Sequence, residues 1–153
     1  MVRHDKIAAF ALLVCTMSSY GEIESTLIRV PISTGELFDK LTILEIKIKR
    51  VTDPKKRENV LNEWQELTNT LKQHLAMNPE LMLLKEELMQ INEQLWKIED
   101  AIRAKEAQQL FDKEFIELAR DIYFTNDKRC CLKRKINEET GSALIEEKEY
   151  TKY

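Results

Sequence analysis

The chain has 153 residues and a formal net charge of -3, with 24 Lys and Arg against 27 Asp and Glu. This length fits a single domain with its own buried core, and the slight acidity excludes a general attraction to nucleic acid or to an anionic membrane surface. Because only 3 Gly and 3 Pro occur, while 33% of the residues are charged and 43% are hydrophobic, we expect an all-helical protein.

The three cysteines are Cys15, Cys130 and Cys131. An odd count with an adjacent pair makes a poor disulfide framework. Neighbouring residues on a helix point about 100° apart, so Cys130 and Cys131 should not bridge each other. Cysteines of this kind favour a reducing, cytoplasmic location. No stretch of the sequence reaches the roughly 18 apolar residues of a membrane span.

Residues 1–27 form an N-terminal extension that we expect to lie outside the folded domain, which covers residues 28–153. Residues 1–21 have a basic start, an apolar run and then small residues, which resembles a weak export signal. Asp5 interrupts the basic region, however, and no A-x-A cleavage site follows. Met17 offers a later translation start. We therefore favour the cytoplasm, with export as the alternative.

The first predicted helix follows the segment TLIRVPIS, which is typical of an extended lead-in or an edge strand. Ser33 and Glu36 form an S-x-x-E capping box that opens a helix over about residues 34–51. Ile43 and Ile46 lie off the main apolar stripe of this helix. A helix that is apolar on two sides is either central in the core or shared with a partner, so we expect a homodimer.

The second and third helices are separated by an Asn-Pro pair. An N-cap at Asp53, followed by proline, opens the second helix over about residues 54–76. The third helix, over about residues 79–110, has the most regular pattern, because seven apolar residues alternate spacings of three and four. These residues are Leu81, Leu84, Leu88, Ile91, Leu95, Ile98 and Ile102.

The fourth helix is predicted over about residues 113–140, between an N-cap at Asp112 and a terminating Gly141. Its seam comprises Phe115, Leu118, Ile122, Thr125, Arg129, Leu132 and Ile136. Short connections make consecutive helices antiparallel neighbours. The sequence therefore predicts an antiparallel up-down bundle of four helices, in which the third and fourth form a long, coiled-coil-like hairpin of about 45 Å.

Polar side chains interrupt the apolar face of the third helix around the stretch LWKIEDAIRAKE. Asn92 and Glu99 have mostly apolar neighbours one turn away, whereas Asp100 points outward. Arg103 lies one turn beyond Glu99 and can pair with it. With partners from the fourth helix, these residues predict a polar layer inside the bundle. The predicted layer consists of Asn92, Trp96, Glu99, Arg103, Glu106, Tyr123, Asn126 and Arg129.

Two interpretations of this layer stay open. Buried polar residues fix the register and partner choice of packed helices, and we favour this structural role. Alternatively, the Arg and Asn donors line a small pocket for an anion or a sugar, closed by Trp96 and Tyr123.

Known catalytic and metal-binding motifs do not occur in the sequence. Neither His4 nor His74 has the spacing of a metal ligand, and there is no cysteine-based zinc pattern. Gly-rich phosphate loops and G-x-S-x-G are missing too. The E-x-x-D of Glu36 and Asp39 precedes every E-x-x-E, the reverse of the order in helical nucleotide pyrophosphatases. We therefore expect no cofactor, and an enzyme is the less favoured class.

A basic run, NDKRCCLKRKIN, lies in the fourth helix. Its cations spread around the helix, and two glutamates follow. This pattern favours a solvated basic face over a phosphate-binding one, so nucleic acid is not an expected partner.

Three blocks of the sequence resemble a known family. They are VPISTGELFDKLTILEIK, NEQLWKIEDAIRAKE and FIELARDIYFTNDKR. Together they are similar to the core of a small bacterial family of all-helical domains of unknown function, over about residues 28–150. The resemblance implies an association with glycosyltransferases that make surface polysaccharides. It implies no catalytic residue.

The sequence thus predicts a helical structural or protein-interaction module, accessory to surface-glycan synthesis, with a second copy or a glycosyltransferase as its partner. The alternative is a protein that binds an anionic sugar or a nucleotide sugar, or an enzyme, through the buried Glu, Arg and Asn side chains of the polar layer.

Overall fold

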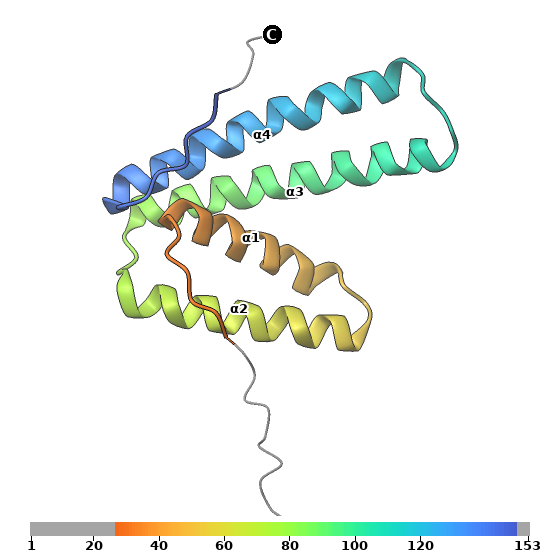
Figure 1. The fold of residues 1–153 in the computed structure, drawn as a ribbon. Helices are drawn as coiled ribbons and strands as arrows, with labels where there is room; N and C mark the ends of the chain where they lie inside the picture. The colour runs from red at the N-terminus through yellow and green to blue at the C-terminus, as the bar shows by residue number, and fades with distance from the viewer. Residues whose placement is uncertain (1–26, 150–153) are drawn as a thin grey trace, which may run out of the picture. The chain divides into compact units, whose positions relative to one another are not determined.

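The computed structural model describes residues 27–149 of the chain. These residues form four helices and no strand (Figure 1). In chain order the helices are α1 (Thr34–Arg50), α2 (Pro54–His74), α3 (Pro79–Ala107) and α4 (Lys113–Thr140). The prediction of an all-α fold is confirmed, and each helix lies within a few residues of its expected bounds.

The N-terminal predictions, namely the export signal at residues 1–21 and the later start at Met17, lie outside the described residues. Internal contacts divide the chain into two units, residues 1–31 and residues 32–153, and all four helices belong to the second. Residues 27–33 carry no regular secondary structure. The expected lead-in to the first helix is therefore present, but as an irregular segment and not as an edge strand.

Each helix begins at a side chain that satisfies free backbone N–H groups. The N-cap side chains of Ser33, Asp53, Asn78 and Asp112 each accept a hydrogen bond from the backbone N–H three residues further on. Gly141 ends α4 in the left-handed conformation, with φ of 60°. These local contacts explain why the sequence predicted the helix ends so closely.

The first helix is the centre of the packing. It contacts α2, α3 and α4, and α3 and α4 pack along each other as a long hairpin (Figure 1). Among the described helices α2 packs along α1 alone, and none of its residues is fully buried. The four helices form the predicted bundle, in which α1 contacts α2 as well as the hairpin of α3 and α4. At the C-terminal end of α2, Leu71 and the C-cap residue Leu75 pack against the core.

The hydrophobic core lies where α1 crosses the hairpin. Phe38, Leu88 and Ile136, one from each of the three helices, are fully enclosed. Ile46 is only 1% exposed, and Ile43 is half-buried. The apolar character of α1 on two sides is therefore explained by its central position, and Ile46 provides no free surface for a dimer.

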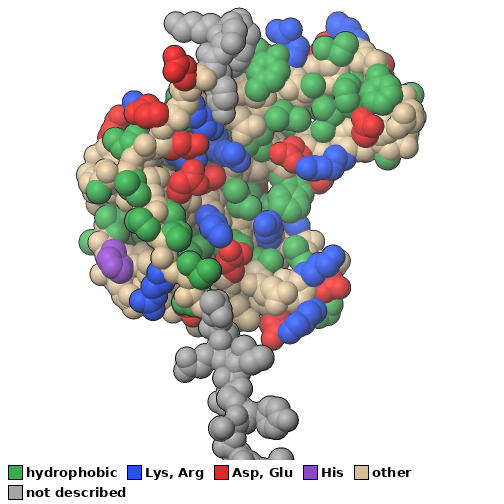
Figure 2. Space-filling view, in the orientation of Figure 1, with side chains coloured by type: hydrophobic (Ala, Val, Ile, Leu, Met, Phe, Trp, Pro, Cys, Tyr) green, Lys and Arg blue, Asp and Glu red, His purple; other side chains and the backbone are tan. Residues whose placement is uncertain are grey.

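The apolar side chains of the hairpin are fully buried only in the part that α1 covers. The partners of α1 across the interface lie at residues 85–96 of α3 and 129–137 of α4. Beyond them we define the distal half of the hairpin as residues 99–124. Four seam residues of this half, Ile102, Phe115, Leu118 and Ile122, are only half-buried. Figure 2 shows the hairpin tip projecting above a hollow, with hydrophobic side chains on the visible surface.

Candidate functional site

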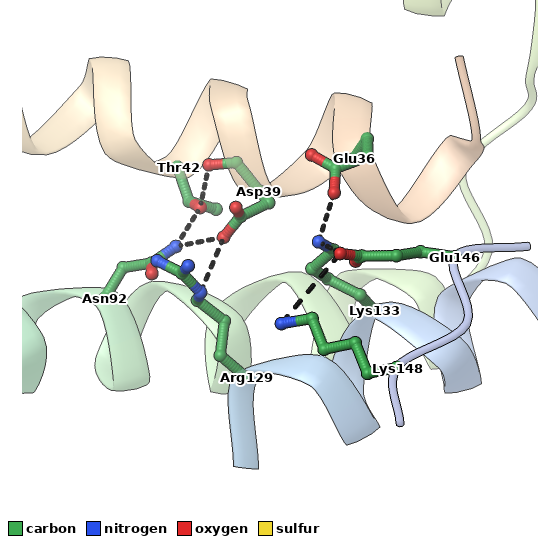
Figure 3. A network of polar contacts seen from close by, with 8 residues as sticks. All are labelled: Glu36, Asp39, Thr42, Asn92, Arg129, Lys133, Glu146 and Lys148. Atoms are coloured by element: carbon green, nitrogen blue, oxygen red, sulfur yellow. Dashed lines mark hydrogen bonds and ion pairs between the residues drawn. The ribbon is translucent and has the colours of Figure 1, made fainter. Parts of the chain in front are cut away.

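A row of polar side chains on α1 faces the hairpin. Glu36, Asp39 and Thr42 recur every three residues, which places them on one face of the helix (Figure 3). Asp39 and Thr42 are buried, although both are polar. A buried carboxylate is costly unless it is paired and hydrogen-bonded, so its partners decide what this row can do.

Asn92 of α3 provides the central contact. Its amide Nδ2 donates to Asp39 Oδ1 at 2.8 Å and to Thr42 Oγ1 at 2.9 Å. The Thr42 hydroxyl donates in turn to the backbone carbonyl of Asp39 at 2.8 Å. From α4, Arg129 Nε lies 4.0 Å from Asp39 Oδ1. Three helices therefore meet at one buried carboxylate, whose charge is opposed by a guanidinium and whose oxygen accepts from an amide.

A second cluster lies one turn closer to the start of α1. The Lys133 side chain of α4 is only 6% exposed and forms ion pairs with Glu36 and with Glu146, the latter at 2.5 Å. Lys148 lies 3.9 Å from the other oxygen of Glu146. Lys133 is therefore held between α1 and the segment that follows α4 (Figure 3).

The two carboxylates determine the ionisation of Lys133. Burial by itself opposes its charge, but hydrogen bonds to Glu146 and Glu36 outweigh that effect, and the pKa of Lys133 is raised above its ordinary value. The hydrogen bond from Lys133 likewise lowers the pKa of Glu146. Both shifts favour the charged forms, so Lys133 and Glu146 are ionised at neutral pH.

Close backbone contact explains the Ser-Thr-Gly sequence at the start of α1. The Gly35 N–H donates to Asn137 Oδ1 at 2.7 Å. A Cβ atom at Gly35 would lie 2.4 Å from the carbonyl oxygen of Lys133, so only glycine fits between α1 and α4. The Thr34 N–H donates to Ser142 Oγ at 3.2 Å. The first turn of α1 is thus fixed to the end of α4.

The structure brings two of the eight predicted polar-layer residues into this network, Asn92 and Arg129. Trp96 lies apart from it, with the guanidinium carbon of Arg50 5.5 Å from its ring centroid. Asn126 is half-buried and Glu106 is exposed. Tyr123 is exposed and packs against Phe124, with the ring centroids 5.0 Å apart.

The predicted burial of Glu99 is wrong. Its carboxylate does pair with Arg103, at 2.6 Å, but the two side chains are 41% and 68% exposed. Its neighbours one turn away on α3, Leu95, Trp96 and Ile102, are apolar, as those of a buried residue are. Its side chain stays partly exposed because no third helix covers the distal half of the hairpin.

Apart from Arg129, the sequence did not predict the residues that α1 and α4 contribute to the network. These residues are Gly35, Glu36, Asp39, Thr42, Lys133 and Asn137. A usable signal was present, because Asp39 directly follows the apolar pair Leu37 and Phe38, and Thr42 repeats its position one turn later. That pattern marks a polar row on an otherwise apolar face.

The network is satisfied from within. Among the described residues, every buried polar side-chain atom has a hydrogen-bond partner, and no group of three metal-ligating side chains is present. A shallow groove along α3 and α4, lined by Ile91, Cys131 and Leu132 among others, includes none of the network residues. Chemically, the network is suited to joining three helices.

The fold and the network define an all-helical domain whose first helix is fixed across a long hairpin by buried polar contacts. The sequence matches the family described as "Family of unknown function (DUF6165)" over residues 28–153, and the chain belongs to this family. No curated protein and no solved structure matches the chain. None of the helices in the described part is long and apolar enough to cross a membrane.

Proposed function

We propose that this chain is a helical interaction module that pairs with a second copy of itself through the distal half of the hairpin. The main support for the proposal is a change in burial along the apolar residues that face each other in the α3–α4 hairpin, which we call the seam. The seam residues Leu88 and Leu95 are buried beneath α1, whereas Ile102 and Ile122 continue the same pattern without a covering helix. An apolar face of this kind is typical of a protein interface.

The composition of the distal half supports self-association. Phe111 and Ile116 are 56% and 57% exposed, and Leu110 beside them is also exposed. Two such hairpins placed face to face would supply the four helices that a bundle needs around its core. In a twofold arrangement the same patch lies on both copies, and the Glu99–Arg103 pair at its edge offers charges of both signs.

In this proposal the buried polar network is a structural element. It holds α1 over one half of the hairpin and leaves the other half free for a partner. A partner from surface-glycan synthesis, such as a glycosyltransferase, belongs to the same proposal and rests on the resemblance of the three sequence blocks. The free thiols of Cys130 and Cys131 support a reducing, cytoplasmic setting.

Binding of an anionic sugar or nucleotide sugar is the second candidate, and one contact favours it. Arg129 is 27% exposed and lies 4.0 Å from Asp39, beyond the range of a close ion pair. Its guanidinium therefore retains donor capacity toward solvent. Thermal stabilisation by a panel of nucleotide sugars, lost in Arg129→Met, would support this function.

Light scattering over a range of concentrations tests the dimer. We expect a mass near twice the 18.1 kDa of one chain at micromolar concentration. Phe111→Glu with Ile116→Glu should return the mass to that of one chain, because both changes place charge on the proposed interface.

The matched control is Met82→Glu with Leu83→Glu, which alters two exposed apolar residues near the other end of α3. It should remain dimeric. A mass of 18.1 kDa for the unmodified chain at every concentration, or equal dissociation of both double variants, would contradict the proposal.

A further inference from the structure

The segment after α4 lies over the site where α1 meets α4. We call residues 142–149 the C-terminal strap (Figures 1 and 3). Ser142 accepts a hydrogen bond from the Thr34 N–H, Glu146 pairs with Lys133, and Glu147 pairs with Arg134. The Ser142 N–H also donates to the carbonyl of Asn137. The strap therefore contacts α1 and α4 through the backbone and hydroxyl of Ser142 and through two carboxylates.

Apolar contacts contribute little to holding the strap. Leu144 and Ile145 are 45% and 48% exposed, so the two aliphatic side chains in the middle of the strap are not packed into the core. Of the two ion pairs of the strap, Glu147–Arg134 is exposed to solvent and contributes little, so the partly enclosed Glu146–Lys133 pair is the main attachment. The strap can therefore detach without disturbing the apolar core formed by Phe38, Leu88 and Ile136.

The surface beneath the strap is built to receive carboxylates. Lys133 and Arg134 are adjacent cations, and Lys133 is nearly enclosed by the protein. When the strap detaches and removes Glu146, Lys133 keeps only Glu36 as a counter-charge. The two cations Lys133 and Arg134 then face one carboxylate. The N–H of Thr34, at the positive end of the α1 dipole, lies at the edge of this site, where it donates to Ser142 Oγ. Together these groups form a cationic site at the junction of α1 and α4.

We propose that the strap is an intramolecular stand-in for a ligand, and that the site beneath it binds an extended acidic segment of a partner protein. The chemistry of that segment is shown by the strap itself, which combines a hydroxyl, exposed aliphatic residues and two consecutive glutamates, in the sequence SALIEEKE. The partner segment carries adjacent carboxylates for Lys133 and Arg134. The strap and the partner compete for one site.

The competition makes binding conditional. A tethered segment has an effective concentration in the millimolar range, so a free segment at micromolar concentration is excluded while the strap is intact. Weakening the strap removes this competition and exposes the site. The site is separate from the distal half of the hairpin and does not depend on the dimer proposed above.

A labelled peptide with the sequence SALIEEKE tests the inference by fluorescence anisotropy on full-length protein. We expect Glu146→Gln with Glu147→Gln to bind the peptide at least tenfold more tightly than the unmodified chain, with affinity that falls as salt rises. Adding Arg134→Gln, a change at an exposed position, should weaken binding again. The dimer-interface variant Phe111→Glu with Ile116→Glu should leave peptide binding unchanged.

The control peptide is SALIQQKE, in which both carboxylates are replaced by amides. Equal binding of the two peptides, or equal affinity of the strap variant and the unmodified chain, would overturn the inference. The variant Glu146→Gln with Glu147→Gln keeps an intact distal half and should still form the dimer. If it does not, the strap of one copy binds the other copy, and the assignment to a separate partner is overturned.

Discussion

Asn92 of α3 and Asp39 of α1 form the central buried contact between the first helix and the hairpin, with 2.8 Å between Asn92 Nδ2 and Asp39 Oδ1. The amide of Asn92 also reaches the hydroxyl of Thr42. The Asn92 amide therefore donates hydrogen bonds to two buried oxygen atoms of α1. This contact fixes where α1 lies along the hairpin.

Removing the amide of Asn92 should be costly. Asn92→Ala leaves the Asp39 carboxylate buried with only the 4.0 Å contact to Arg129, and we expect the free energy of unfolding to fall by about 2–3 kcal/mol. Urea denaturation measures the change. Gln94→Ala, at an exposed position on the same helix, is the control and should change stability by less than about 0.5 kcal/mol. A loss no larger than that of the control would mean that the buried contact does not fix α1.

Glu99 should behave as a surface residue. Its pair with Arg103 is exposed to solvent and lies along one helix, and such pairs contribute about 0.3–0.5 kcal/mol. Glu99→Ala should therefore cost about as little as Asp100→Ala, its exposed neighbour. A loss of about 3 kcal/mol on thermal or urea unfolding of Glu99→Ala would show that another chain buries this carboxylate in solution.

Gly35→Ala tests the close approach of α1 to α4. Helix propensity alone predicts that this change raises the free energy of unfolding by about 1 kcal/mol. The added Cβ would lie 2.4 Å from a backbone oxygen of α4, which cannot move without its helix, so we expect a net loss of about 2–3 kcal/mol.

Gly141→Ala is the matched control for Gly35→Ala. The site around Gly141 has open space but a φ of 60°, and an alanine there should cost about 1 kcal/mol from backbone strain alone. Calorimetric unfolding of both variants gives the comparison. A stabilised Gly35→Ala would contradict the tight packing of the first turn.

The ion pair of Glu146 and Lys133 should make strap attachment depend on pH. The lowered pKa of Glu146 means that the unfolded chain binds its proton more readily. The contribution of Glu146 to the free energy of unfolding is therefore complete above pH 4.5, its ordinary pKa, and is lost as the pH falls through the lowered pKa. For Lys133 the pKa is raised, so its contribution is complete below 10.5 and is lost as the pH rises through the raised value.

Unfolding of the unmodified chain and of Glu146→Gln across this pH range measures the effect. The stability difference between them should be largest between pH 4.5 and 10.5 and should vanish in acid and in strong base. Glu149→Gln, an exposed position in the same strap, should show no such window. A difference that is constant with pH would exclude a role for the ion pair.

The sequence by itself determined the four helices and their ends. Caps such as Ser33 and Asp112 act on N–H groups three residues away, and the apolar periodicity of α3 is read within single turns. Local interactions of this kind need no knowledge of the rest of the fold. The same local pattern placed Asn92 correctly in the interior.

Only the tertiary structure decided which polar residues are buried together. Asn92 and Glu99 sit two turns apart on α3 in similar apolar surroundings, yet Asn92 is buried and the side chain of Glu99 is 41% exposed. The difference comes from α1, whose 17 residues span about 25 Å and so cover only part of α3, which has 29 residues. Where that shorter helix lies is set by the contacts of Gly35, Asp39 and Lys133 with residues distant in sequence. Periodicity along one helix contains no information about such a covering neighbour, because burial is a property of the surfaces that meet and not of either surface alone.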